Sequence, residues 1–459
     1  MSDLLEPLPL TGADCFLLAF EGEVRRKTGA SHVSQIVLRL GPGFDVEAFR
    51  RVIGEVAAAN PILRAPIRRQ ALVGAPMYFL DRAAPAPGVG FAVHPTGTPL
   101  AESMVAPALG AVPEVFYRRF NSRFDARRGR VMHVDVAPRG GAVPGTDVAL
   151  TWQHMLLDGN GSERFVEHLA ACAADPSLDR NIAITRGEGG ASSPAAAELP
   201  AASGQRGRMA QTWQRYMEGL ATRPPGSLAG PLRRVQQELR YDELRLEGES
   251  AVAATTRAKQ LAGFLTPMLF YLAVSMRAHQ AVAERRGKVP KSYVVPLPVN
   301  LRPKGGQGEV FRTHVSLLWF QVTPEETRDL AAMIEVLKAQ RLEAIRNKLV
   351  EAGVAAMDFA RYAPGPVYSY MARRSFGGEL SSFFFAYTGD FAAGAASLCG
   401  AEILDGFHAP PVPASPGSAL AFSLRGGGLN VTHVHQRGVL DAAELALFRE
   451  SILEDLGGR

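Results

Sequence analysis

The chain has 459 residues, of which 47% are apolar and 21% are charged. This length exceeds that of one typical domain and suits two halves of roughly 200 residues each, with enough apolar side chains for a substantial core. The formal net charge is +5, and 43 of the 50 basic residues are arginine. Together with abundant alanine and glycine, this skew is typical of a GC-rich genome rather than of nucleic-acid binding, so we expect no nucleic-acid partner.

The three cysteines are Cys15, Cys172 and Cys399. Their spacing matches neither a metal site nor a disulfide framework, so we expect a cytoplasmic protein without a bound metal. The first twelve residues, MSDLLEPLPLTG, lack the basic and apolar regions of a signal peptide.

One uncharged stretch, residues 260–276, is the best candidate for a membrane span. It is slightly shorter than the roughly 20 residues that a bilayer requires. Thr266 and Pro267 have the pattern of a helix N-cap and first helical position. We therefore expect a buried core helix and no transmembrane segment.

Strand and helix patterns alternate along the N-terminal part of the chain. Residues 34–40 predict a strand, and Asp45 then caps a helix that extends to about Ala58. The apolar residues of this helix recur on one face, namely Phe49, Val52, Ile53 and Val56. Residues 75–80 predict a further strand, and residues 148–152 form an apolar run that reads as another.

The composition shifts to glycine, alanine, serine and proline between residues 186 and 207, which is typical of a flexible connection, with a helix expected at 209–220. We divide the chain into an N-terminal subdomain (1–185), a flexible crossover linker (186–230) and a C-terminal subdomain (231–459). Within the C-terminal subdomain the expected elements are a helix at 266–278, strands at 293–304 and 314–322, one long helix at 327–350, a hairpin at 418–435 and a final helix from Asp441.

The sequence Gln153-His154-Met155-Leu156-Leu157-Asp158-Gly159 fits the pattern HxxxDG and directly follows the apolar run. A hydroxyl or amine that attacks an acyl carbon must lose a proton near neutral pH. Imidazole is the side chain best matched to accept that proton. The motif therefore makes His154 a candidate general base, with a structural histidine as the alternative.

The motif resembles the active-site signature of the chloramphenicol acetyltransferase-like superfamily. This superfamily includes nonribosomal peptide synthetase condensation domains, wax ester synthases and alcohol acyltransferases. Gln153 stands where the fuller HHxxxDG form has its first histidine. Residues 295–303, VPLPVNLRP, resemble the PVNLR element of the superfamily, and residues 387–391 and 398–403 resemble its late strands. The resemblance implies an α/β two-layer sandwich fold, with two acetyltransferase-like subdomains that form a pseudo-dimer around an active-site tunnel.

The resemblance also implies roles for individual residues. His154 would be the catalytic base. Asp158, which could otherwise be thought to orient His154, would point away from it and pair with Arg302. Gly159 would permit a backbone conformation that a side chain obstructs. The oxyanion of acyl transfer needs a hydrogen-bond donor. The candidates are the backbone amide of Gly159 and three side chains across the cleft, with Thr388 favoured: Thr388, Asn300 and Ser316.

Two further groups of residues stand out. His433 and His435 lie two positions apart and share a strand face. Without a third ligand at suitable spacing, we expect exposed hairpin residues rather than a zinc site. The basic cluster could dock phosphates or an acidic carrier protein, although a solvated basic face is the simpler interpretation; its members are Arg118, Arg119, Arg123, Arg127, Arg128 and Arg130.

We therefore expect an acyltransferase. An acyl group would move from a thioester, on coenzyme A or on the phosphopantetheine of an acyl or peptidyl carrier protein, to a small-molecule alcohol or amine. Coenzyme A or the carrier would act as co-substrate, with no tightly bound cofactor. The alternative from another class is a catalytically silent, condensation-like module that recruits partner or carrier proteins. A third hypothesis, a membrane-associated lipid or wax ester synthase, would require an exposed apolar patch near the tunnel.

Overall fold

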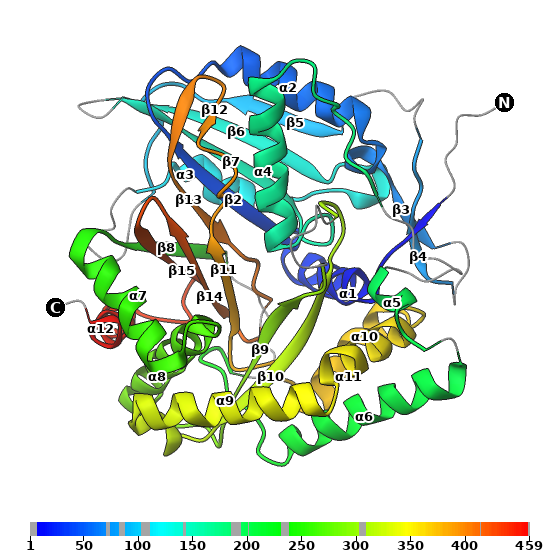
Figure 1. The fold of residues 1–459 in the computed structure, drawn as a ribbon, viewed down its shortest axis with the longest axis vertical. Coiled ribbons are helices and arrows are strands. Elements are labelled where there is room, and N and C mark those ends of the chain that lie inside the picture. Colours follow the sequence, from blue (N-terminus) through cyan, green and yellow to red (C-terminus); the bar gives the residue numbers. More distant parts are fainter. Residues whose placement is uncertain are drawn as a thin grey trace.

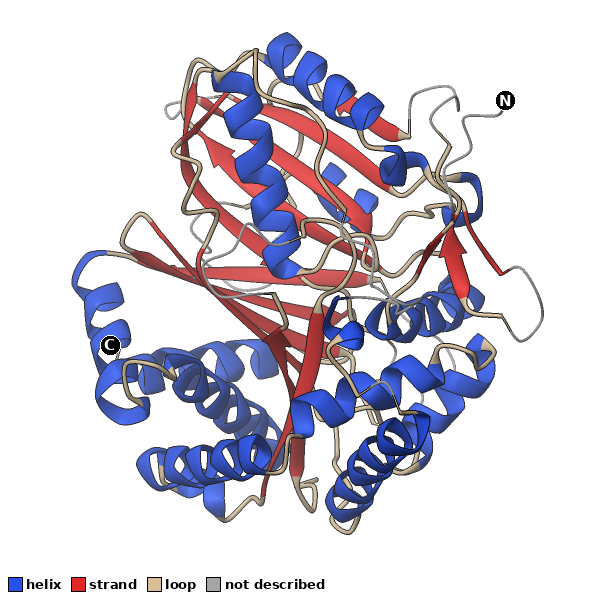
Figure 2. Cartoon of the chain, turned by 45° about the vertical axis from the view of Figure 1, so that its right-hand side comes forward, coloured by secondary structure: helices blue, strands red, loops and turns tan. Residues whose placement is uncertain are grey.

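A computed structural model describes residues 7–69, 74–81, 88–101, 111–140, 144–184, 194–200, 202–230, 238–302, 309–413 and 415–457. Two large sheets with helices packed against them form the centre of the molecule (Figures 1 and 2). The mixed α/β architecture that the sequence predicted is therefore present.

The first sheet has six strands in the order β12-β13-β2-β7-β6-β5. These are β12 (Ser397–Leu398), β13 (Ala401–Ala409), β2 (Val33–Leu40), β7 (Gly145–Gln153), β6 (Met132–Arg139) and β5 (Val89–Val93). Helices α2 (Val46–Ala59) and α4 (Gly159–Ala174) cover one face (Figure 1). Strand β7 is buried along almost its whole length, because both of its faces are covered. This explains why four of the five residues at 148–152 in this strand are apolar.

The second sheet has four strands in the order β11-β14-β15-β8. These are β11 (Phe384–Asp390), β14 (Ser418–Arg425), β15 (Gly428–Gln436) and β8 (Leu239–Leu246). An antiparallel pair, β9 (Tyr293–Asn300) with β10 (Val315–Val322), lies beside β11. The surrounding helices are α7 (Gly248–Ala262), α8 (Pro267–Arg285), α9 (Leu330–Arg346) and α12 (Ala442–Leu456).

The remaining elements lie around these sheets. They are β1 (Leu8–Pro9), α1 (Gly12–Thr28), β3 (Ile67–Arg69), β4 (Pro76–Tyr78), α3 (Glu114–Phe120), α5 (Pro194–Ala197), α6 (Ser203–Ala221), α10 (Leu349–Ala360) and α11 (Gly365–Arg374). Helix α1 packs against α10 and α11, so the start of the chain lies beside its C-terminal half. Strand β13 also comes from that half, yet it pairs with β2 in the first sheet. The two sheets are therefore tied together by segments distant in sequence.

Several local expectations are confirmed. Asp45 caps α2 by accepting a hydrogen bond from the Ala48 amide at 2.9 Å, and the predicted apolar face of α2 is buried. Helix α8 begins at Pro267, and most of its residues are buried. Across the described ranges no single helix has the length and apolarity to cross a membrane, although α7 and α8, bent by 103°, pass that test as a pair.

The long helix expected at 327–350 is confirmed for most of its length, but it does not continue unbroken to Val350. Helix α9 ends at Arg346, and α10 starts at Leu349. The break lies at Lys348, whose φ of 51° places it in the left-handed region. No glycine or proline marks this position; Asn347, directly after the last residue of α9, is the sequence signal for the helix end.

The segment expected as a flexible linker, 186–230, is largely helical where it is described. Helix α6 spans Ser203–Ala221 and packs against α10. Its Tyr216 hydroxyl donates a hydrogen bond to the Trp319 carbonyl on β10. The helix expected at 209–220 is therefore confirmed as part of α6, and it docks on the β9–β10 pair. Of the glycine- and alanine-rich stretch at 186–207, residues 186–193 and 201 lie outside the described residues.

The expectation that His433 and His435 are exposed is wrong. Their exposed fractions are 6% and 2%. Strand β15 lies between β14 and β8, and helices cover it. The His433 ring stacks on Phe448 of α12 with centroids 4.3 Å apart. The hairpin pattern predicted β14 as one neighbour of β15. It did not indicate that β8, which lies far earlier in the sequence, is the other neighbour.

Candidate active site

His154 directly follows β7 and lies beside the first residues of β2. Its backbone N–H donates to the His32 carbonyl at 3.2 Å. Opposed residues of an antiparallel pair share a face. Val33 opposes Gln153 and Ser34 opposes Trp152, so the side chains of His32, Ser34 and His154 lie on one face. Ser34 Oγ is 2.7 Å from His154 Nδ1, and the rings of His32 and His154 make an edge contact at 5.8 Å.

The surroundings of His154 keep its imidazole neutral. The side chain is half-buried. Burial lowers the pKa of His154 to about 4; the Asp158 carboxylate opposes this shift, and His408 adds to it. His408 lies on β13, where its Nε2 is 2.7 Å from Glu163 Oε1 of α4. At neutral pH the His154 ring is therefore uncharged, with a proton on one nitrogen and a lone pair on the other, and the uncharged form is the one a general base needs.

Asp158 faces away from His154 and acts as the N-cap of α4. Its Oδ1 accepts the Gly161 amide at 2.8 Å. Its Oδ2 accepts both Arg302 Nη1 at 2.9 Å and the His314 amide at 2.8 Å. Burial alone would raise the pKa of Asp158, but the Arg302 guanidinium and these amides together hold it below its ordinary value. Asp158 and Arg302 form a buried, charge-assisted pair between two segments distant in sequence.

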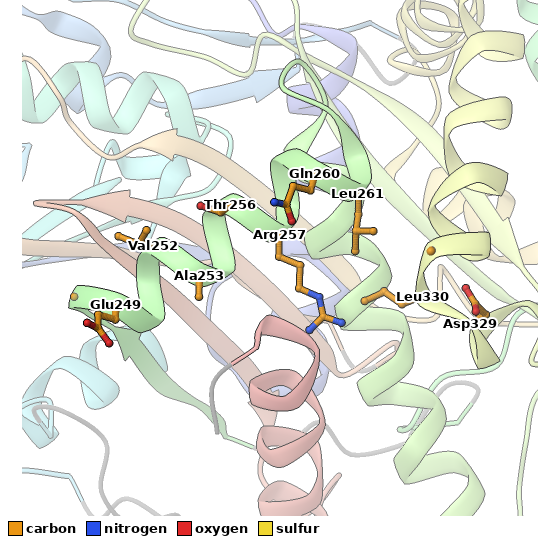
Figure 3. Close-up of a pocket in the computed structure, with 11 residues that line it drawn as sticks. Glu249, Val252, Ala253, Thr256, Arg257, Gln260, Leu261, Asp329 and Leu330 are labelled. Carbon is orange, nitrogen blue, oxygen red and sulfur yellow. The ribbon is translucent and has the colours of Figure 1, made fainter.

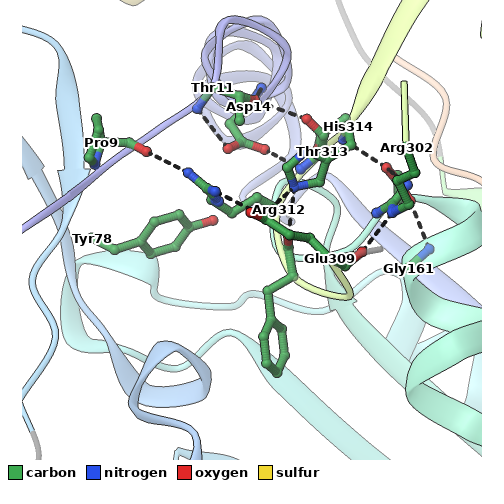
Figure 4. A network of polar contacts seen from close by, with 12 residues as sticks. Pro9, Thr11, Asp14, Tyr78, Gly161, Arg302, Glu309, Arg312, Thr313 and His314 are labelled. Carbon is green, nitrogen blue, oxygen red and sulfur yellow. Dashed lines mark hydrogen bonds and ion pairs between the residues drawn. The ribbon is translucent and has the colours of Figure 1, made fainter. Parts of the chain in front are cut away.

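A loop at residues 309–314 bonds to both members of the Asp158–Arg302 pair, and we call the pair and this loop the clamp (Figure 4). Arg302 Nε donates to the Glu309 carbonyl at 2.6 Å. The Arg312 amide donates to the Leu156 carbonyl, inside the HxxxDG motif, at 2.7 Å. Arg312 has a φ of 72° and is fully buried, and its Nη2 is 2.8 Å from Glu309 Oε2. The loop therefore holds the motif at Leu156 and at Asp158.

Helix α1 supports the same loop from the other side. Asp14 lies in the first turn of α1 and forms a capping box with Thr11. Its Oδ1 accepts the Thr313 amide at 2.8 Å. Thr313 precedes His314, whose amide bonds to Asp158. The N-terminal helix is thus linked through one loop to the active-site motif.

Gly159 does not have the special backbone conformation that was expected of it. Its φ is not positive, and an added Cβ would meet only Thr388 Cγ2 at 3.4 Å. Gly161 has the steric requirement instead, because its Cβ would lie 2.2 Å from the Val310 carbonyl oxygen. Gly159 is the first residue of α4, whereas Gly161 faces the 309–314 loop. The glycine that permits close packing is therefore two residues later.

The three side chains considered as oxyanion donors have different surroundings. Thr388 lies against Gly159, and among the described residues its buried Oγ1 has no hydrogen-bond partner. Asn300 Oδ1 accepts the Arg302 amide at 3.1 Å, so Asn300 supports the clamp. Ser316 is fully buried and donates to the Val350 carbonyl at 3.0 Å, which joins β10 to α10. Of the three side chains, Thr388 alone combines contact with the motif and an uncommitted hydroxyl.

The basic cluster has one half-buried member. Arg119 Nε is 2.8 Å from Asp135 Oδ2 on β6. The other five side chains are exposed, as expected of a solvated basic face.

The three cysteines are buried and unpaired. Over the described ranges, no three or more His, Cys, Asp or Glu side chains are grouped so that they would hold a metal ion.

A groove of about 1040 Å³ lies elsewhere on the molecule (Figure 3). It runs along α7, from Gly248 to Leu261, and is closed by the first residues of α9. None of its lining residues belongs to the segments that carry His154, Asp158 or Arg302. The groove is therefore separate from the candidate active site.

Sequence reasoning missed several residues of the site. Ser34 and His32 lie far before His154 in the sequence and belong to no motif. Glu309, Arg312 and His314 lie near Arg302 in sequence, but a buried loop does not show the periodicity of a helix or strand. A pairing of the strand at 34–40 with the apolar run at 148–152 would have been the signal that places Ser34 beside His154.

The sequence itself matches no protein-family model and no curated protein sequence. Solved structures match along nearly the whole chain. The first condensation domain of the CDA synthetase has a TM-score of 0.68 at 15% identity, covering 98% of this chain and 95% of that one. TRI3 trichothecene 15-O-acetyltransferase from Fusarium sporotrichioides has a TM-score of 0.69 at 12% identity, covering 98% and 94%. The starter condensation domain of rhizomide synthetase RzmA has a TM-score of 0.64 at 13% identity, with the same coverages.

These similarities span both sheets and the connections between them. The sequence identities are far too low for the substrates of those proteins to be assigned to this one. They agree with the resemblance seen in the HxxxDG and PVNLR elements. The chain has the chloramphenicol acetyltransferase-like α/β fold that condensation domains share.

Proposed function

We propose that the protein is an acyltransferase that moves an acyl group from a thioester to a hydroxyl or amine, with His154 as general base. One observation carries the proposal: His154 is half-exposed at the end of β7, and its pKa is lowered to about 4, so its ring is neutral and available. The similar structures include an O-acetyltransferase and a condensation domain bound to C8-CoA and Leu-SNAC. These support thioester donors and both acceptor classes.

In the proposed reaction, the acceptor O–H or N–H gives its proton to the free ring nitrogen of His154 as the acceptor attacks the thioester carbonyl. The tetrahedral oxyanion then re-forms the carbonyl and expels the thiolate, which takes the proton back from His154. The ester or amide and a free thiol are the products, and no covalent enzyme intermediate forms. Removal of a positioned general base typically costs about 10²–10⁴-fold in rate.

Thr388 is the proposed oxyanion donor. Its side chain lies beside Gly159, which belongs to the motif that carries His154, with the methyl carbon Cγ2 as the contacting atom. Its buried hydroxyl has no hydrogen-bond partner among the described residues. A donor that is free before the reaction can bond to the oxyanion as it forms, without first breaking another bond. The Gly159 amide, at the start of α4, is the second donor candidate, because the first amides of a helix lack intrahelical acceptors.

Asp158 has no part in the proton path in this proposal. Both of its oxygens accept hydrogen bonds from other groups, and its partners are Arg302, Gly161 and His314. It holds the turn after β7 in place. Asp158 and Arg302 are therefore positioning residues rather than proton carriers.

The test is release of free thiol by the purified protein from a panel of acyl-coenzyme A and acyl-phosphopantetheine carrier donors, with pooled alcohols and amines. Acceptor-dependent release that disappears in His154→Ala supports the proposal. Equal release by both proteins means background hydrolysis and removes His154 as base for those donors. Absence of release from every donor, with a carrier protein that nevertheless binds, favours the silent recruiting module instead.

A further inference from the structure

We propose that Ser34 is the residue that sets the tautomer and orientation of His154, by accepting a hydrogen bond from His154 Nδ1–H. This inference rests on the proposed function, because it concerns the same base. The observation behind it is the 2.7 Å contact between Ser34 Oγ and His154 Nδ1. No motif includes Ser34, and it lies 120 residues before His154 in the chain.

The position of Ser34 is rigid. It lies in β2, which is hydrogen-bonded to β7 on one side and to β13 on the other. Its register partner is Trp152, two residues before His154. Ser34 is only 5% exposed. A hydroxyl on a central strand, opposite the strand that ends at His154, cannot drift relative to the ring that it contacts.

The contact matters because the two ring nitrogens of a neutral histidine have opposite roles. One carries the proton and donates, and the other has the lone pair and accepts. If Nδ1–H donates to Ser34, Nε2 has the free lone pair and can take a proton from the acceptor. If the Ser34 hydroxyl donates to Nδ1 instead, Nε2 carries the proton and cannot act as base. The proposed reaction requires the first arrangement.

His32 restricts the same ring from its side. Its ring meets His154 edge-on, with an interplanar angle of 74°. The segment is anchored to α1, because Glu21 Oε2 accepts the His32 amide at 2.5 Å and Glu21 Oε1 accepts the Ser31 hydroxyl at 3.0 Å. A rotation of the His154 ring away from Ser34 would meet this fixed neighbour. Ser34 therefore supplies the hydrogen bond to the His154 ring, and His32 restricts the rotation of that ring.

The kinetic test compares Ser34→Ala, Ser34→Thr and Ser275→Ala in the thiol-release assay. Ser275 is the matched control, since it is a fully buried hydroxyl that donates to the Tyr271 carbonyl within α8 and does not contact His154. Loss of a hydrogen-bond partner that orients a metal-bound histidine typically costs about 10- to 100-fold. We expect a loss of that size in kcat for Ser34→Ala with KM unchanged, recovery of most of kcat in Ser34→Thr, and wild-type kcat in Ser275→Ala. Equal kcat in wild type and Ser34→Ala would overturn the proposal.

A second measurement needs no turnover. In a protein labelled with ¹⁵N-histidine, the His154 signals are assigned by their loss in His154→Ala, and their shifts distinguish a protonated from an unprotonated ring nitrogen. We expect protonated Nδ1 and unprotonated Nε2 at neutral pH, and a shift towards mixed tautomers in Ser34→Ala. Protonated Nε2 in the wild type contradicts the proposal. The expected tautomer in a protein that transfers no acyl group would uphold Ser34 as the positioning residue and reject the proposed function alone.

Discussion

Among the ion pairs that join distant parts of this chain, Asp158–Arg302 and Glu243–Arg39 have carboxylates whose pKa values shift in opposite directions. Asp158 accepts three hydrogen bonds, and its pKa lies below the ordinary value. Glu243 on β8 is bonded to Arg39 on β2 at 2.6 Å. Burial raises the pKa of Glu243 to about 8; Arg39 opposes this shift, and Asp405 reinforces it. In the described part of the chain, no donor bonds to Glu243 Oε1, and the neighbouring group is the carboxyl of Asp405.

The difference shows that an arginine partner alone does not keep a buried carboxylate ionised. The desolvation cost of a buried charge is offset only when additional donors satisfy its remaining lone pairs. Asp158 has two backbone amides besides Arg302, whereas Glu243 faces a second carboxylate, Asp405. The pair beside His154 is therefore a stable fixed charge, and the pair between the two sheets is sensitive to pH.

The largest effect is expected from breaking the Asp158–Arg302 pair. Asp158→Ala leaves the Arg302 guanidinium buried without its carboxylate, and loss of one partner of a buried pair costs about 3–5 kcal/mol of unfolding free energy. Urea denaturation measures this loss. The matched control is Glu47→Ala, which breaks the exposed Arg50–Glu47 pair and should cost less than about 0.5 kcal/mol. A similar, small cost for both variants would show that the clamp is not a structural element.

The second effect concerns Glu243. Because its folded pKa is raised, its contribution to stability is complete below the unfolded pKa near 4.5 and is lost as the pH rises through about 8. Glu243→Gln mimics the protonated side chain at every pH. Relative to this variant, the wild type should lose unfolding free energy between pH 5 and 8, by on the order of 1 kcal/mol per pH unit. A difference that stays constant from pH 5 to 9 would mean that Glu243 is ionised in the folded protein.

A smaller effect separates two glycines of the α4 start. In Gly161→Ala the new methyl group would lie 2.2 Å from the Val310 carbonyl, so the 309–314 loop must move. Such overpacking typically costs about 1–3 kcal/mol of unfolding free energy. Gly159→Ala meets only Thr388 Cγ2 at 3.4 Å and should keep the wild-type Tm while lowering kcat. Thermal unfolding and thiol release of both variants check this; a lower Tm in Gly159→Ala alone would reverse the assignment.

The sequence predicted those parts of the molecule that repeat or match a known pattern. The amphipathic helix after Asp45, the buried helix from Pro267 and the hairpin of β14 and β15 are visible in local periodicity. The pairing of Asp158 with Arg302, which lie far apart in the chain, was expected through the resemblance and not through any local signal. The structure brings these two residues together at 2.9 Å.

What could not be predicted depends on pairing between distant strands. The burial of His433 follows from β8 as a neighbour of β15, and the contact of Ser34 with His154 follows from the β2–β7 register. Neither pairing leaves a mark in the local sequence. The helix break at Lys348 is of another kind, since a non-glycine residue adopts positive φ there under tertiary packing. Gly161 was overlooked because Gly159 completes the motif and Gly161 lies outside it.

The central claim is that His154 is a neutral base whose pKa is held low by its surroundings. The measurement that tests it most directly is kcat/KM as a function of pH, from 3.5 to 8, for a donor and acceptor pair found by thiol release, with circular dichroism at each pH to show that the fold persists. Since the neutral ring is the active form, kcat/KM should be full above pH 6 and fall on acidification with a midpoint near the His154 pKa of about 4. A midpoint near 6.5, or an acid limb that remains in His154→Ala, would contradict the account.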